Sequence, residues 1–137
     1  MKITVSIPCY RSAKTLPYVV EQIKKTVAQR PSYSYQIILV NDCSPDNTFD
    51  VIRSLCQEDE NIVGVNLSRN WGQATARMAS IPYIEGDCTV FMDDDGQHPI
   101  DHLFDLVDKI EEGYDLVSAD FSQKQTKFMN RFTSAIS

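Results

Sequence analysis

The chain has 137 residues, enough for one domain with a substantial core. Apolar residues make up 42% of it and charged residues 23%, as in ordinary globular proteins. Because 19 acidic residues outnumber 13 basic ones, the formal charge is −6, which argues against a nucleic-acid-binding protein.

Short apolar runs and helical stripes alternate along the chain. The runs are typical of buried strands, and the stripes place apolar residues at helical spacing. In chain order the predicted elements are a strand at 3–7, a helix at 15–29, a strand at 35–40, a helix carrying Phe49, Ile52, Leu55 and Cys56, a strand at 62–67, a helix at 72–83, a strand at 88–92, a helix at 100–112 and a strand at 114–118. Pro82 is expected to end or kink the third helix.

This alternation predicts parallel strands joined by right-handed helical crossovers. We therefore expect an α/β fold, a three-layer nucleotide-binding α/β/α domain with a mainly parallel sheet. Such a fold does not by itself name the chemistry. Neither GxGxxG nor GxxxxGK[ST] occurs, so a dinucleotide-binding domain and a P-loop NTPase are both unsupported.

Three consecutive carboxylates, Asp93–Asp95, follow the predicted strand at 88–92. Open α/β sheets bind ligands at the carboxyl ends of strands, and a cluster of like charges is unfavourable without a neutralising cation. Hard divalent cations prefer oxygen ligands, and Gln97 adds an amide oxygen. An acidic cap on the helix that begins near Pro99 is the alternative, but one carboxylate would suffice for it. The pattern favours a metal and phosphate site.

Segments that carry polar side chains also follow the first three predicted strands. They are Pro8, Cys9 and Tyr10 after the first strand, Asp42 after the second, and Ser68, Arg69 and Asn70 after the third. Each has a structural alternative, since Tyr10 can pack beside its loop, Asp42 can cap a turn and Arg69 can be solvated. Because successive strand ends meet at one edge, their repeated placement favours a crevice that binds a nucleotide.

The four cysteines show no CxxC or Cys/His metal spacing. Cys9, Cys43 and Cys88 fall on or beside predicted strands, and Cys56 falls on the apolar face of a predicted helix. We therefore expect buried, reduced thiols in a reducing compartment. The sequence has no leader pattern and no apolar run long enough to span a bilayer, which predicts a cytoplasmic location.

Four ordered motifs resemble those of glycosyltransferase family 2, whose GT-A fold is Rossmann-like. They are Val5–Tyr10, Leu39–Thr48, Leu67–Gly72 and Met92–Pro99. The Gln-His-Pro run that ends the last motif is similar to the polyprenyl-phosphate glycosyltransferases, a subgroup that includes dolichyl-phosphate mannose synthase. The resemblance implies a donor-binding core at residues 1–120, and a chain that stops before the acceptor-binding or membrane part.

The resemblance also implies a role for each motif residue. Pro8, Tyr10 and Asp42, with Cys9 beside them, would contact the base and ribose of a nucleoside diphosphate sugar, and Arg69 and Gly72 would line that pocket. Asp93 and Asp94 would approach the ribose and diphosphate, and Asp95 and Gln97 would ligate Mg²⁺ or Mn²⁺. The metal would stabilise charge on the leaving diphosphate, so Asp93 and Asp95 are the expected catalytic residues.

The expected acceptor is a polyprenyl phosphate or a growing surface polysaccharide. An acceptor phosphate is already ionised at neutral pH, so it needs cations rather than a general base. In the subgroup these cations follow the fifth strand, where the tail at 121–137 offers Lys124, Lys127 and Arg131 and no acid. This basic amphipathic tail suits a membrane surface at the cytoplasmic face, or packing against further protein.

Two other classes of function stay open at this point. The same carboxylate and metal site would serve a nucleotidyl- or phosphotransferase, and the chain would also serve as a non-catalytic nucleotide-binding module. An exposed edge of the sheet would allow oligomers to form by strand pairing.

Overall fold

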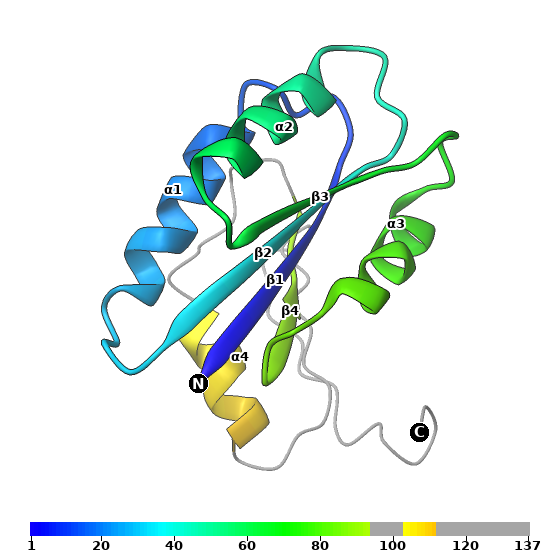
Figure 1. The fold of residues 1–137 in the computed structure, drawn as a ribbon. Helices are drawn as coiled ribbons and strands as arrows, with labels where there is room; N and C mark the ends of the chain where they lie inside the picture. The colour runs from blue at the N-terminus through cyan, green and yellow to red at the C-terminus, as the bar shows by residue number, and fades with distance from the viewer. Residues whose placement is uncertain (94–102, 112–137) are drawn as a thin grey trace, which may run out of the picture.

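The computed structural model describes residues 1–93 and 103–111 (Figure 1). Strands and helices alternate along the chain, as the sequence periodicity predicts. The elements are β1 (Lys2–Cys9), α1 (Leu16–Val27), β2 (Ser34–Asn41), α2 (Thr48–Glu58), β3 (Ile62–Asn66), α3 (Gln73–Ser80), the 3₁₀ turn η1 (Ile81–Tyr83), β4 (Cys88–Phe91) and α4 (Leu103–Glu111).

The four described strands form one parallel sheet in the order β3-β2-β1-β4. Cys9 is paired with Asn41 and Asn41 with Asn66, so β1, β2 and β3 end at the same level. β4 ends earlier, with Phe91 opposite Ser6 of β1. The carboxyl ends of all four strands therefore lie at one edge of the sheet. This arrangement confirms the predicted fold class.

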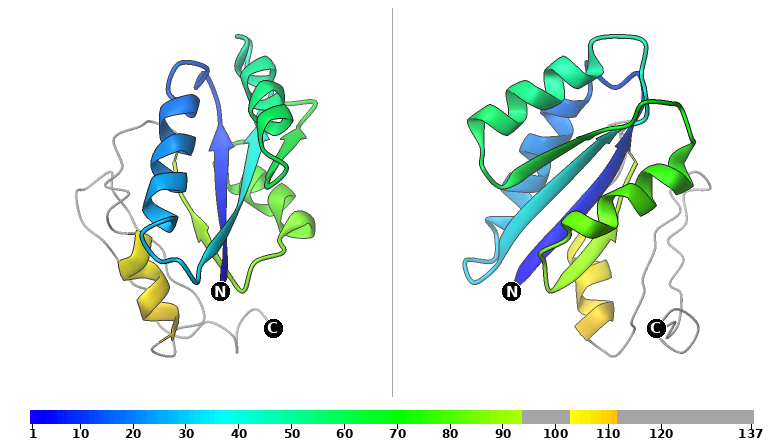
Figure 2. Two further views of the ribbon diagram at one scale, coloured as in Figure 1. Left: turned by 60° about the vertical axis from the view of Figure 1, so that its left-hand side comes forward. Right: turned by 45° about the vertical axis from the view of Figure 1, so that its right-hand side comes forward.

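Side chains of the strands alternate between the two faces of the sheet. On one face they pack with α1, α2 and α4 in the main core, which includes Ile3, Ile7, Leu16, Ile23, Leu39, Ile52, Leu103 and Val107. On the other face a smaller apolar cluster contains Ile38 and Val40 of β2 and Ala76 of α3. Figure 2 shows α1 and α3 on opposite sides of the sheet. Thr4, Ser6 and Gln36 are buried polar residues whose alternation in β1 and β2 places them on the α3 face.

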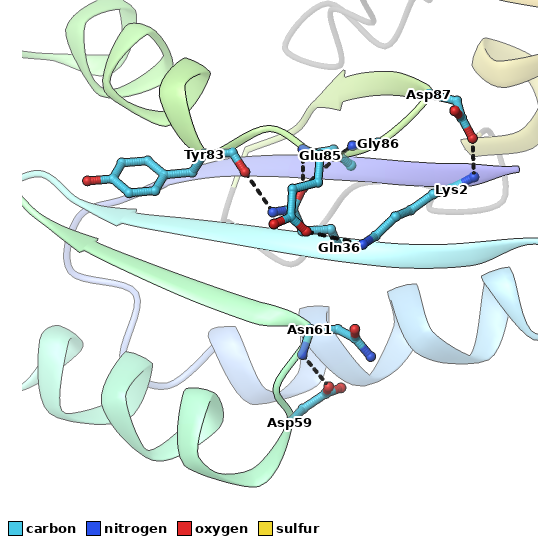
Figure 3. A network of polar contacts seen from close by, with 9 residues as sticks. Lys2, Gln36, Asp59, Asn61, Tyr83, Glu85, Gly86 and Asp87 are labelled. Atoms are coloured by element: carbon cyan, nitrogen blue, oxygen red, sulfur yellow. Dashed lines mark hydrogen bonds and ion pairs between the residues drawn. The ribbon is translucent and has the colours of Figure 1, made fainter.

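Near the amino ends of the strands, Gln36 is the centre of a polar network (Figure 3). Its Nε2 donates to the carbonyl of Tyr83 at 2.7 Å, and its Oε1 accepts from the Glu85 N–H at 2.9 Å. The hydroxyl of Thr4 donates to the same Oε1 at 2.8 Å and accepts from the Gly86 N–H at 2.9 Å. A Cβ at residue 86 would lie 2.4 Å from that hydroxyl, so the turn into β4 requires glycine.

Most predicted elements lie within a few residues of the observed ones. The third helix ends at Ser80, and Pro82 falls in η1, which confirms that this proline ends the helix. The predicted strand at 114–118 and the tail at 121–137 lie outside the described residues. Within the part of the chain that the structure describes, no helix has the length and apolar character needed to cross a bilayer.

The prediction for the cysteines needs a correction. Cys9 and Cys88 are buried and Cys56 is half-buried, and burial raises the pKa of the Cys56 thiol. Cys43 is exposed, so the expectation of a buried thiol is wrong there. The physical reason is that Cys43 lies in the loop beyond β2 in left-handed backbone, with a φ of 55°, rather than in the sheet.

Candidate functional site at the carboxyl edge of the sheet

The ends of β1 and β2 place Tyr10 and Asp42 at adjacent positions of this edge. The Asp42 N–H donates to the carbonyl of Cys9 at 2.9 Å, which continues the β1–β2 pairing past the strands. Pro8 and Cys9 are buried in β1, whereas Tyr10 is 41% exposed. Among the residues predicted from the first motif, Tyr10 therefore has an exposed side chain at this edge, and Pro8 and Cys9 lie in the buried strand before it.

The carboxylate of Asp42 holds the loop that follows β3. Asp42 is 5% exposed, and its Oδ1 and Oδ2 accept hydrogen bonds from the backbone N–H groups of Trp71 at 2.8 Å and Gly72 at 3.0 Å. Gly72 has a φ of 93°, in the left-handed region that favours glycine. Asp42 thereby fixes the backbone from which α3 starts.

Two aromatic rings lie at this edge, each with a guanidinium near its face. The Cζ of Arg11 lies 5.5 Å from the centroid of the Tyr10 ring, and the Cζ of Arg69 lies 5.8 Å from that of Trp71. Trp71 is 55% exposed although its backbone is held by Asp42. Exposed rings beside cations suit a ligand that is both aromatic and anionic, as a nucleotide is.

The loops after β1 and β2 form one hydrogen-bonded unit around Asp46. Its Oδ1 accepts hydrogen bonds from the hydroxyls of Ser44 and Thr48 and from the Thr48 N–H at the start of α2. The bond from Ser44, and then those from Thr48, hold the pKa of Asp46 below its usual range. The Ser44 and Thr48 hydroxyls also accept from the backbone N–H groups of Arg11 at 2.8 Å and Ser12 at 3.1 Å.

Asp93, the first residue of the acidic triplet, lies just beyond β4. Val90 and Met92 belong to the main core, so the alternation of side chains places Asp93 on the α3 face of the sheet. Its Oδ1 lies 3.4 Å from Nη2 of Arg77 in α3. The two side chains are 35% and 40% exposed, so this ion pair is open to solvent and to a ligand.

The other predicted site residues lie outside the described residues. They are Asp94, Asp95, Gln97, Lys124, Lys127 and Arg131. Within residues 1–93 and 103–111, no group of three or more His, Cys, Asp and Glu side chains is placed to hold a metal ion. The donor chemistry of the acidic segment fits a hard divalent cation, because it offers carboxylate and amide oxygens.

A family profile described as glycosyl transferase family 2 matches residues 4–134. The chain belongs to this family. It is 34% identical to the undecaprenyl-phosphate 4-deoxy-4-formamido-L-arabinose transferase of Shewanella sediminis and 33% identical to that of Serratia proteamaculans. Both alignments cover 98% of this family 2 chain, and they cover 40% and 41% of the two relatives. The chain thus spans about two fifths of their length.

Solved glycosyltransferases share the fold of this family 2 chain. A mannosyltransferase from Pyrobaculum calidifontis, solved with GDP-Man and Mn²⁺, has a TM-score of 0.60 at 21% identity, over 68% of this chain and 27% of that one. A glucosyl-3-phosphoglycerate synthase from Mycobacterium tuberculosis, solved with Mn²⁺ and UDP, has a TM-score of 0.60 at 21% identity, over 80% and 39% of the chains. This likeness confirms the GT-A fold.

Sequence reasoning did not give a site role to Trp71 or Arg77. Trp71 stands inside the third motif, but nothing in its spacing shows that Asp42 holds its backbone. Arg77 is the one charged residue in α3, and this feature of the sequence could have marked it as a candidate. Helical spacing alone does not show that this side chain extends to the end of β4.

Proposed function

We propose that this family 2 chain binds the nucleoside diphosphate sugar of a glycosyltransferase that delivers the sugar to a polyprenyl phosphate or a growing surface polysaccharide. The observation that carries the proposal is the meeting of four strand ends, which bring Tyr10, Asp42, Trp71 and Asp93 to one edge of the sheet. Aromatic rings, a buried carboxylate and an acidic segment match the base, ribose and metal-bound diphosphate of such a donor.

We assign Tyr10, Arg69 and Gly72 to the nucleotide pocket, with Pro8 and Cys9 behind it. Asp42 acts there in two ways. It fixes the Trp71–Gly72 backbone, and each of its carboxylate oxygens has a second lone pair that can accept from a base or sugar.

We assign Asp95 and Gln97 as ligands of Mg²⁺ or Mn²⁺, and Asp93 and Asp94 as the neighbours of the ribose and diphosphate. A bound divalent metal supplies Lewis-acid stabilisation of the leaving diphosphate. The oxygen donors of this segment support the assignment, as do the solved relatives described with Mn²⁺. The chain's own task is to hold the donor in place and to keep its carboxylates at defined positions.

The names of the curated relatives support a polyprenyl phosphate as the acceptor. An ionised phosphate needs cations, and Lys124, Lys127 and Arg131 supply them in the tail. A lipid-linked acceptor lies in a membrane, so the whole protein would work at the cytoplasmic membrane face, with the amphipathic tail close to the surface.

Calorimetric titration of the chain with UDP, GDP, CDP and TDP, each with and without Mn²⁺, tests the proposal. We expect metal-dependent binding of one diphosphate, lost in Asp95→Ala and kept in Glu60→Ala, which removes one exposed acid at the other end of the sheet. Absence of binding to all four would contradict the donor site. Unchanged binding in Asp95→Ala would contradict the metal assignment alone. Release of a nucleoside diphosphate from the bound sugar nucleotide separates this activity from nucleotidyl or phosphoryl transfer.

A further inference from the structure

We propose that Arg77 is a positioning residue of the donor site, which acts on the donor through Asp93. Arg77 lies outside the four sequence motifs, and its Nη2 is 3.4 Å from the Asp93 carboxylate. The inference rests on the proposed function, because the place of Asp93 matters for binding only if this edge of the sheet holds a donor.

The backbone of Arg77 is fixed against the strand that neighbours β4. The hydroxyl of Ser80 donates to the Arg77 carbonyl at 2.6 Å and accepts from the hydroxyl of Ser6 in β1 at 2.8 Å. Ser6 and Ser80 are fully buried, and Ser6 is paired with Phe91 at the end of β4. These contacts link the last turn of α3 through β1 to the end of β4, and so set the distance between Arg77 and Asp93.

Stability alone does not explain an arginine at this place. The Nε of Arg77 is buried and has no hydrogen-bond partner among the described residues. A buried N–H without an acceptor lowers the free energy of unfolding, and an apolar side chain of similar length would avoid that loss. What the guanidinium adds, and an apolar side chain cannot, is its contact with Asp93.

The contact places a positive charge at the start of the acidic segment, and it orients the carboxylate of Asp93. Three consecutive carboxylates repel one another, and a guanidinium beside the first of them offsets part of that repulsion. A carboxylate that is already held in place needs little reorganisation when a ligand binds. Lysine would keep the charge, but it lacks the planar group that directs a carboxylate.

A double-mutant cycle on the complete chain tests the inference, with the affinity for the best-bound nucleoside diphosphate in Mn²⁺ as the readout. We expect Arg77→Met to fold as the wild type does and to weaken binding about tenfold, as is usual when a residue that orients a ligand is lost. Arg77→Lys should recover part of the affinity. Arg53→Met removes the same charge from an exposed position of α2 and should leave binding unchanged.

The decisive comparison is between Asp93→Asn and the variant that carries both Asp93→Asn and Arg77→Met. If Arg77 acts through Asp93, the double variant binds no more weakly than Asp93→Asn alone. Additive losses, or full affinity in Arg77→Met, would overturn the inference and leave the proposed function intact. If the wild type binds none of the diphosphates, the proposed function fails and this inference with it. Arg77→Gln takes the place of Arg77→Met in the cycle if the methionine variant does not fold.

Discussion

The carboxylate of Asp42, at the end of β2, accepts a hydrogen bond of 2.8 Å from the backbone N–H of Trp71, 29 residues later in the chain. The bond ties the loop after β3 to a buried group of the sheet. The ring of Trp71 is exposed above this fixed backbone, and it belongs to the single tryptophan of the chain. Its fluorescence therefore reports on the proposed donor site alone.

Asp42→Asn should destabilise the loop that carries Trp71. The substitution replaces one acceptor oxygen by an amide NH₂, so one of the two backbone N–H groups loses its partner. We expect a loss of about 1–3 kcal/mol in the free energy of unfolding, measured by urea titration with circular dichroism, and a shift in tryptophan emission. Asp50→Asn, at an exposed position of α2, is the control. Equal stability and emission in both variants would contradict the geometry of the loop.

Binding of a nucleoside diphosphate with Mn²⁺ should change the emission of Trp71. The ring lies at the edge where the base, ribose and diphosphate are proposed to bind. Removal of the metal with EDTA should reverse the change, and Asp95→Ala should lose its metal-dependent part. A calorimetric binding signal without any change in emission would show that the nucleotide does not reach Trp71.

Cys43→Gly should stabilise the protein. Cys43 has a φ of 55°, a conformation that is costly for residues with a Cβ and open to glycine. The free energy of unfolding should rise by up to about 1 kcal/mol, since the added freedom of glycine in the unfolded chain offsets part of the gain. Cys43→Ala keeps the Cβ and should give no increase. The explanation fails if the glycine variant is no more stable than the alanine variant.

Gly86→Ala should destabilise the protein more than Gly64→Ala. A Cβ at residue 86 would lie 2.7 Å from the Thr4 backbone nitrogen and 2.9 Å from the Lys2 carbonyl oxygen, which are main-chain atoms of β1. A Cβ at residue 64 would instead meet the side chains of Ile52 and Cys56, which can shift. We expect losses of about 3 and about 1 kcal/mol in thermal unfolding. The reverse order would mean that the turn before β4 yields more easily than α2.

The ion pair of Arg30 and Asp108 should make stability depend on pH in the acid range. The guanidinium donates to both carboxylate oxygens, at 2.8 and 3.0 Å, and this hydrogen bonding holds the pKa of Asp108 below its usual range. A lowered pKa in the folded state adds stability above the unfolded value of about 4, and this is lost as the pH falls through the folded pKa.

Urea titrations of the wild type and Asp108→Asn across this range measure the effect. The difference in stability between them should be constant above about pH 5 and shrink below about pH 4. Glu60→Gln, at an exposed site, controls for the loss of one negative charge. A difference that stays constant down to pH 2 would contradict a contribution from this ion pair.

Periodicity in the sequence was sufficient to predict the layers of the fold. The runs at 3–7 and 35–40 form β1 and β2, as predicted. Both faces of the sheet are covered there, so successive residues of each strand are buried and most residues of each run are apolar. Pro82 marked the end of a helix because proline has no backbone N–H to donate and its ring clashes with the preceding turn. Both features depend on residues close together in the chain.

Partners that are distant in sequence could not be predicted in this way. Asp42 was expected at a nucleotide site, but its hydrogen bonds to Trp71 and Gly72 depend on the path of a loop between two strands. The contact between Arg77 and Asp93 depends on how α3 crosses the sheet. Neither the path of that loop nor the crossing of α3 produces a periodic pattern of apolar residues in the sequence.

The shortness of β4 has a consequence for how this domain can vary. β4 has four residues, and the Asp87 N–H donates to the Lys2 carbonyl at 2.7 Å just before it. The number of residues between that turn and Asp93 therefore determines on which face of the sheet the Asp93 side chain lies. Inserting or deleting a single residue between them would turn the Asp93 side chain to the opposite face, away from Arg77. Homologous domains that keep this pair should therefore tolerate new side chains in the segment while conserving its length.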